Sequence, residues 1–171
     1  MGDLDIDLNG GLIGKYRIIQ KLGEGATSEV FLAVDGFNHR NVAIKRVRLP
    51  TVGESVENHY RSHFFAAEAA LVGKLQHPNV VQIFDAVDDP GQPYLVMEYV
   101  PGVTLRRYCR PDGLLALDQI VEIGFKCAMA LSYCFRQGLI HRDVKPANIL
   151  AVIDEQGQAV DIKLSDFGSA L

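Results

Sequence analysis

Eight consecutive residues carry the densest polar chemistry of this chain. Residues 141–148 read H-R-D-V-K-P-A-N and have an apolar pair on each side. Polar side chains between two core segments cost stability unless they have a use. The carboxylate of Asp143, the amine of Lys145 and the amide of Asn148 can serve a proton, a phosphate group and a metal ion. The alternative is a polar loop after a helix, which the other motifs of the chain disfavour.

A lysine and a glutamate in the first half of the chain form a second candidate pair. Lys45 lies between apolar neighbours on a strand predicted over residues 41–49, and Glu68 lies within a helix predicted over residues 58–76. The apolar stripe of that helix is Phe64, Phe65, Leu71, Val72 and Leu75. A carboxylate on a buried stripe is costly unless it meets a cation, so Lys45 is the expected partner of Glu68. A lysine whose amine snorkels to solvent is the alternative.

A glycine-rich turn precedes that lysine. It reads G-E-G-A-T-S-E-V over residues 23–30 and follows a strand predicted over residues 16–22. A dinucleotide-binding turn would open a helix. Here apolar residues alternate over 30–34, which predicts a strand. Gly23 and Gly25 then join two strands, where glycine lets backbone N–H groups approach a bulky anion such as a nucleotide phosphate. The alternative is an ordinary hairpin turn.

The remaining elements must position these side chains. Strands are predicted around residues 80–87 and 94–99, and helices over about 105–109 and from Asp118, as N-cap, to Gly138. The core face of the longer helix is predicted to be Ile120, Val121, Gly124, Cys127, Ala128, Leu131 and Cys134, so its cysteines are expected to pack rather than react. A hairpin pairing residues 149–153 with 160–164 leads to D-F-G at 166–168.

In this order the motifs resemble the protein kinase family, from Tyr16 to the last residue. The matching features are the glycine-rich turn, V-A-I-K at 42–45, Glu68, the M-E-Y-V-P-G connector at 97–102, H-R-D…N and D-F-G. The resemblance implies an α+β, two-lobe fold with a five-stranded β N-lobe, one main helix and a partial helical C-lobe. The implied divisions are a lead-in at 1–15 and a kinase domain at 16–171, made of an N-lobe (16–97), a hinge (98–103) and a partial C-lobe (104–171). Without the other motifs, the connector could be a linker that touches no ligand.

The resemblance also implies a chemistry, in which a serine/threonine protein kinase transfers the γ-phosphate of ATP to protein hydroxyls with Mg²⁺. Lys145-Pro146 is similar to Ser/Thr-specific members. The implied catalytic residues are Asp143, Lys145, Lys45 and Glu68, and the implied magnesium ligands are Asn148 and Asp166. The implied nucleotide-binding residues are Leu22, Gly23, Gly25, Ser28, Val30, Ala43, Lys45, Met97, Glu98, Val100 and Leu150. An apolar column of Val72, Ile83, His141 and Phe167 is also implied.

The sequence departs from the family pattern at two points, and these bear on whether the chain is an active kinase. Ser28 replaces the third glycine of the turn, and the sequence stops at Leu171, soon after D-F-G. A truncated catalytic domain is therefore expected, with Arg142 lacking a phosphate partner and the helix over 118–138 exposing apolar surface. An ATP-binding or interaction module without transferase activity is the alternative.

The composition narrows the remaining possibilities. The 171 residues are 48% hydrophobic and carry a net charge of −4, so no general attraction to nucleic acid or acidic lipid is expected. Three cysteines without a C-x-x-C pair suit a reducing compartment. The acidic first residues do not suit a signal peptide, and no apolar run is long enough to span a bilayer, so a cytoplasmic protein is expected. His59 and His63 could share a metal ion, but no third ligand is in view, and solvent-facing histidines are expected.

Overall fold

The structure is a computed structural model. It describes residues 11–25, 28–48, 65–66, 68–71, 73–89, 92–153 and 159–167. The chain divides into two compact units. The first unit comprises Met1–Phe65 and Phe84–Tyr99, and the second comprises Ala66–Ile83 and Val100–Leu171.

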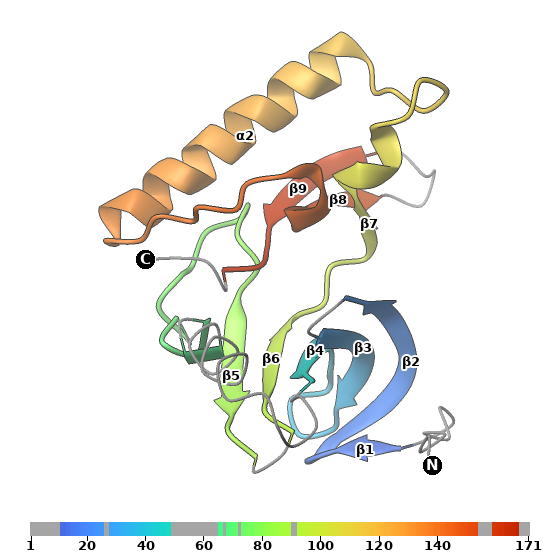
Figure 1. Cartoon of the computed structure of the whole chain (residues 1–171), viewed down its shortest axis with the longest axis vertical. Helices are drawn as coiled ribbons and strands as arrows, with labels where there is room; N and C mark the ends of the chain where they lie inside the picture. Colours follow the sequence, from blue (N-terminus) through green and yellow to red (C-terminus); the bar gives the residue numbers. More distant parts are fainter. Residues whose placement is uncertain are drawn as a thin grey trace, which may run out of the picture. The chain divides into compact units, whose positions relative to one another are not determined.

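The first unit is built on a six-stranded sheet of order β1-β2-β3-β4-β6-β5, strongly curled at β2 and β3 (Figure 1). Its strands are β1 (Leu12–Ile13), β2 (Tyr16–Glu24), β3 (Ser28–Asp35), β4 (Arg40–Val47), β5 (Ile83–Val87) and β6 (Tyr94–Glu98). The five predicted strands are all present. The sixth, β1, falls within the predicted lead-in and pairs antiparallel with the start of β2.

The two faces of this sheet differ in what they carry. One face holds a core cluster of Tyr16, Ile18, Phe31, Ala33, Val42, Ile44, Tyr94 and Val96. Successive side chains on a strand point to opposite faces. The register pairs Val30 with Lys45 and Ala43 with Met97, so these four side chains share the other face. The core therefore supports, from behind, the face that carries the predicted nucleotide residues.

The helix predicted over residues 58–76 lies largely outside the described residues. Phe65, Ala66, Glu68 and Ala69 are helical, but Ala70 and Leu71 already form a turn. The described helix thus ends before Gln76, because Gly73 turns away with a φ of 69° and donates its N–H to the Ile83 carbonyl. Phe64, Val72, His59 and His63 lie outside the described residues.

The second unit combines a small sheet with one long helix (Figure 1). The sheet has the order β7-β8-β9, with β7 at Gly102–Thr104, β8 at Ile149–Ile153 and β9 at Ala159–Leu164. The helix α2 spans Leu117–Arg136, and short 3-10 helices span Leu105–Tyr108 and Pro146–Asn148. The β8–β9 hairpin is confirmed. The sequence did not predict β7, which pairs with β8 at the end of the expected Pro-Gly connector.

The predicted start of α2 is wrong and its predicted end is correct. The N-cap is Ala116, not Asp118, which lies in the first turn, where a negative charge favours the helix dipole. At the other end Gly138 has a φ of 80°, and its N–H donates to the Phe135 carbonyl while that of Leu139 donates to Cys134. This is a Schellman motif, so the predicted glycine stop is confirmed.

The core face predicted for α2 is only partly correct. Cys127 and Cys134 are buried, as expected, together with Ala130. Ile120, Val121, Gly124 and Ala128 are exposed instead. The helix is apolar on more than one side, so periodicity alone could not select the side that packs. On the side that packs, Lys126 places its amine 3.0 Å from Asp161 on β9.

Residues 76–81 belong to the second unit because hydrogen bonds hold them there. The N–H of Val81 donates to the Leu164 carbonyl, and the N–H of Leu164 donates to the Asn79 carbonyl. The Asn79 amide also donates to the Asp161 side chain and to the Ile162 carbonyl, each at 2.8 Å. These contacts attach the segment to β9, where Asp161 also meets α2.

Candidate functional site

The side chain of Asp143 is held from several sides within the second unit. Its Oδ2 accepts hydrogen bonds from Lys145 Nζ at 2.7 Å and from Asn148 Nδ2 at 2.9 Å. Asn148 Nδ2 also donates to the backbone carbonyl of Asp143 at 3.0 Å. The three polar residues singled out in the sequence therefore form one hydrogen-bonded group. Asn148 is buried, whereas Asp143 and Lys145 keep part of their side chains in solvent.

His141 connects this loop to the segment that follows β9. Its Nδ1 accepts from the Asp143 N–H at 3.3 Å, and its Nε2 lies 3.0 Å from the Ser165 carbonyl oxygen. Its ring packs against Phe167, with the ring centroids 4.7 Å apart. The Asn148 carbonyl accepts from both the N–H and the hydroxyl of Ser165. These contacts join the H-R-D and D-F segments, and two members of the expected apolar column, His141 and Phe167, touch each other.

Two residues of this group hold a backbone conformation that L-amino acids rarely adopt. Arg142 has a φ of 62° and Asp166 a φ of 65°. Non-glycine residues in the left-handed region are uncommon and cluster at functional sites, where the surrounding contacts hold the strain. Here both residues adjoin the anchored side chains of His141, Asp143 and Phe167.

The predicted nucleotide residues of the first unit gather on one face of its sheet. Val30, Ala43, Lys45 and Met97 share that face, and Gly23 pairs with Val30 at the end of β2. A Cβ added at Gly23 would meet no described atom within 4 Å, and the nearest atom to one at Gly25 is 3.7 Å away. Packing among described residues therefore does not require glycine at these two positions, and their role at a nucleotide phosphate stays a prediction.

Other predicted site residues lie elsewhere in the structure. Leu22 is near the end of β2 and partly exposed, Ser28 begins β3, and Glu98 ends β6 opposite Val42. Val100 is buried and Leu150 lies on β8, both in the second unit. Lys45 and Glu68 also belong to different units, so their pairing stays a prediction. Glu68 is 4% exposed, as expected of a carboxylate on an apolar stripe.

Comparison with known proteins identifies the family of this chain. The model of the protein kinase domain matches residues 16–171. The chain belongs to the protein kinase family. The matched range begins at Tyr16, the first residue of β2, and includes both the glycine-rich turn and the group around Asp143.

Individual relatives agree with this assignment. The kinase domain is 36% identical over 157 residues to the serine/threonine-protein kinase PrkC of Bacillus subtilis, covering 92% of this chain and 23% of that relative. It is 39% identical over 163 residues to the serine/threonine-protein kinase PknB of Mycolicibacterium smegmatis, covering 93% of this chain and 25% of that relative. The chain therefore spans about a quarter of the length of these relatives.

Solved structures show the same fold. The crystal structure of the Mycobacterium tuberculosis PknI kinase domain matches with a TM-score of 0.74 and 28% sequence identity. The match covers 93% of this chain and 62% of that one. The two-lobe kinase-like fold expected from the sequence motifs is thus confirmed.

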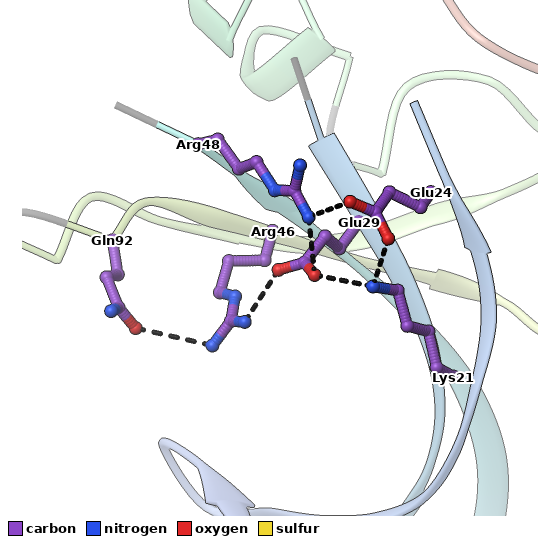
Figure 2. A network of polar contacts seen from close by, with 6 residues as sticks. All are labelled: Lys21, Glu24, Glu29, Arg46, Arg48 and Gln92. Atoms are coloured by element: carbon purple, nitrogen blue, oxygen red, sulfur yellow. Dashed lines mark hydrogen bonds and ion pairs between the residues drawn. The ribbon is translucent and has the colours of Figure 1, made fainter. Parts of the chain in front are cut away.

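Sequence reasoning missed one polar group of this kinase domain (Figure 2). Glu29 on β3 accepts from Lys21 at 2.7 Å and from Arg48 at 2.9 Å through Oε1, and from Arg46 at 2.7 Å through Oε2. Burial disfavours the charged carboxylate, but these hydrogen bonds outweigh it and lower the pKa of Glu29 to about 2. A usable signal existed, because Glu29 alternates with the core residues Phe31 and Ala33 on its strand.

No helix among the described residues is long and apolar enough to cross a membrane. Within the same residues, no group of three or more His, Cys, Asp or Glu side chains is arranged to hold a metal ion. The predicted magnesium ligands, Asn148 and Asp166, are one amide and one carboxylate. Two protein ligands leave the other positions around Mg²⁺ to phosphate oxygens and water. Both Asn148 Nδ2 contacts are made to Asp143, which turns the amide oxygen away from that carboxylate and suits it to a hard cation.

Proposed function

We propose that this domain is the front part of a serine/threonine protein kinase that transfers the γ-phosphoryl group of ATP to protein hydroxyls. The observation that carries the proposal is the anchored carboxylate of Asp143. Its Oδ2 accepts hydrogen bonds from Lys145 and Asn148, and on this basis the proposal gives Oδ1 the substrate hydroxyl. A base held from one side in this way is pre-organised to accept a proton from the other.

The residues of the second unit divide the transfer step among them. The substrate oxygen attacks the γ-phosphorus, and the bond from that phosphorus to the β,γ-bridging oxygen breaks, so ADP leaves with the electron pair. Asp143 accepts the hydroxyl proton. Lys145, whose amine lies beside Asp143, offsets the negative charge that develops on the transferred group. ATP bound with Mg²⁺ supplies the phosphoryl group. Asn148 and Asp166 would hold the Mg²⁺ ions as hard oxygen ligands.

The first unit would hold the nucleotide. Lys45, braced by Glu68, would contact the α- and β-phosphates, and Gly23, Gly25 and Ser28 would cover them. The adenine would be enclosed by side chains and hinge backbone from Leu22, Val30, Ala43, Met97, Glu98, Val100 and Leu150. The support for this assignment is that Val30, Ala43, Lys45 and Met97 share one face of the sheet, with the core cluster behind them.

The proposal includes a reducing, cytoplasmic setting. Its support is that two of the three cysteines, Cys127 and Cys134, are buried on α2. Burial raises the pKa of both thiols, which keeps them protonated and unreactive. Specificity for serine and threonine rests on Lys145-Pro146, which the family places in its Ser/Thr-specific members.

Transfer of labelled γ-phosphate from Mg-ATP to a generic basic protein tests the proposal. The wild-type chain is expected to transfer label, and Asp143→Asn to be slower by at least about 100-fold, because general-base catalysis is removed. Lys45→Met is expected to abolish transfer and leave the fold intact. Asp161→Asn is the matched control, because that carboxylate lies in the same unit but contacts Asn79 and Lys126 instead.

Three outcomes separate the possibilities. Label transfer that is lost in Asp143→Asn and retained in Asp161→Asn supports the kinase proposal. Transfer that survives in Asp143→Asn would show that Asp143 is not the base. A folded wild-type chain that binds Mg-ATP but transfers nothing would instead indicate a nucleotide-binding module.

A further inference from the structure

The ion-pair network around Glu29 lies at the glycine-rich turn but on the other face of the sheet. Arg46 lies directly opposite Glu29 in the register of β3 and β4. The next pair along, Val30 and Lys45, points to the predicted nucleotide face. Arg46 also lies over the Phe31 ring, 5.0 Å from its centroid, so the network adjoins the core cluster. The network therefore reaches the turn without occupying the nucleotide face.

The network joins the two strands that enter and leave the turn. Glu24 and Glu29 are directly opposite each other, and they are the last register pair before the turn. Two like charges in such a position repel. Lys21 and Arg48 each bind both carboxylates, as Figure 2 shows, so two cations bridge a pair that would otherwise separate.

Burial and charge make Glu29 the centre of this network. It is 9% exposed, whereas Glu24 keeps about half of its side chain in solvent. Glu29 receives cations from β2 and β4, and a buried charge of this kind needs all of its partners. Beyond the last pair, the Gly25 N–H donates to the Ser28 carbonyl at 2.8 Å and closes the described base of the turn.

We propose that the network of Lys21, Glu24, Glu29, Arg46 and Arg48 is a brace that holds the glycine-rich turn in place for nucleotide binding, with Glu29 as its positioning residue. The inference rests on the proposed function, because it assigns the turn to the nucleotide phosphates. The brace acts by holding β2 against β3 at the base of the turn, so that backbone N–H groups are presented in one arrangement before ligand arrives.

The test compares two buried carboxylates at opposite ends of β3. Glu29→Gln removes the central charge of the brace with little change in shape. Asp35→Asn is the matched control, because Asp35 is 2% exposed and anchors the β3–β4 turn through Phe37 and Asn38. Two quantities are measured on the full 171-residue chain. One is the dissociation constant of a fluorescent ATP analogue with Mg²⁺, and the other is the hydrogen-exchange rate of the Gly25 amide.

Glu29→Gln is expected to weaken nucleotide binding by about fivefold or more and to speed exchange at Gly25. Asp35→Asn is expected to leave both the dissociation constant and the Gly25 exchange rate unchanged, even if it lowers the unfolding midpoint as much as Glu29→Gln does. Unchanged binding in Glu29→Gln would overturn the inference, and so would an equal loss in both variants, which would indicate general destabilisation.

Two further outcomes distinguish a failure of the brace from a failure of the proposed function. A wild-type chain that binds no nucleotide would overturn the proposed function and the role of the brace in binding. Binding by the wild type with unchanged binding in Glu29→Gln would overturn the brace alone. If Glu29→Gln does not fold, Lys21→Met removes one bridging cation, and the same changes are expected in smaller size. Their absence in that variant would also overturn the inference.

Discussion

At the scale of single residues, His141 connects two segments of the site through one imidazole ring. Its Nδ1 accepts the Asp143 N–H, so the ring proton resides on Nε2 and is donated to the Ser165 carbonyl. His141 therefore orients the Asp143 backbone on one side of its ring and contacts the segment before Phe167 on the other.

Gly102 is a residue whose side chain must be absent. A Cβ there would lie 1.9 Å from the Ala151 carbonyl oxygen on β8. Gly102→Ala must therefore separate β7 from β8, and it is expected to lower the free energy of unfolding by about 1–3 kcal/mol. Urea unfolding followed by circular dichroism measures the change.

Gly124→Ala provides the comparison for that measurement. This glycine lies on α2, where an added Cβ would meet no described atom within 4 Å. Alanine there is expected to raise the free energy of unfolding by roughly 0.4–1 kcal/mol, because it restricts the unfolded chain. A Gly102→Ala chain as stable as the wild type would contradict the close approach of β7 and β8.

At the scale of elements, the sequence predicted those parts that depend on local pattern. Alternation over β3 and turn residues around β8 and β9 identified strands, and Gly138 identified the end of α2. The spacing of Asp143, Lys145 and Asn148 identified residues that do bond to one another. Each of these predictions concerns residues that are close in the chain.

Contacts between residues far apart in the chain could not be predicted from the sequence pattern. The strand β7 has three residues and exists because β8, almost fifty residues later, pairs with it. The packed side of α2 contacts Asp161 and residues near His77, whose ring lies 5.1 Å from that of Tyr133. The brace at Glu29 likewise needs three strands in register before its charges meet.

The brace also gives the first unit a distinct response to acid. The pKa of Glu29 is lowered from the ordinary glutamate value of 4.5 to about 2, so its ionised form is favoured in the folded chain. The stabilisation is present above pH 4.5 and is lost as the pH falls towards 2. The shift corresponds to at most about 3 kcal/mol, and solvent at Lys21 and Arg48 reduces this to about 1–2 kcal/mol.

A difference measurement isolates this contribution from other carboxylates. Hydrogen bonds also lower the pKa of Asp35 and Asp161, although burial opposes the shift in both, so the acid unfolding of the wild type alone would not identify Glu29. The free energies of unfolding of wild type and Glu29→Gln are compared between about pH 6 and pH 2. The difference between the two free energies of unfolding is expected to be constant above about pH 5 and to disappear towards pH 2. A difference of the same size at both ends would contradict the assignment.

At the scale of the whole molecule, α2 places a large apolar surface in solvent. Leu117, Val121, Phe125 and Phe135 are each more than 60% exposed, and Ile120 is 49% exposed. The first three recur every four residues, so they lie on one side of the helix. Contiguous exposed apolar patches promote association, whereas single exposed hydrophobic residues are ordinary. Exposed apolar surface on this helix is therefore present as expected, but only in part from the predicted residues, because Cys127 and Cys134 are buried and Leu117, Phe125 and Phe135 lie outside the predicted stripe.

This surface is expected to make the isolated chain self-associate and bind a hydrophobic dye. The double variant Val121→Glu/Phe125→Lys replaces two of its members with an i,i+4 ion pair that favours the helix. Each lost side chain removes about 1.5–3 kcal/mol of available burial, so self-association is expected to weaken by at least about tenfold. Sedimentation velocity across a concentration series and dye fluorescence measure the two effects. Phe37→Ser is the control, because Phe37 is 85% exposed but belongs to the β3–β4 turn of the first unit and not to this helix. A wild-type chain that remains a monodisperse monomer and binds no dye would show that the surface of α2 does not drive association.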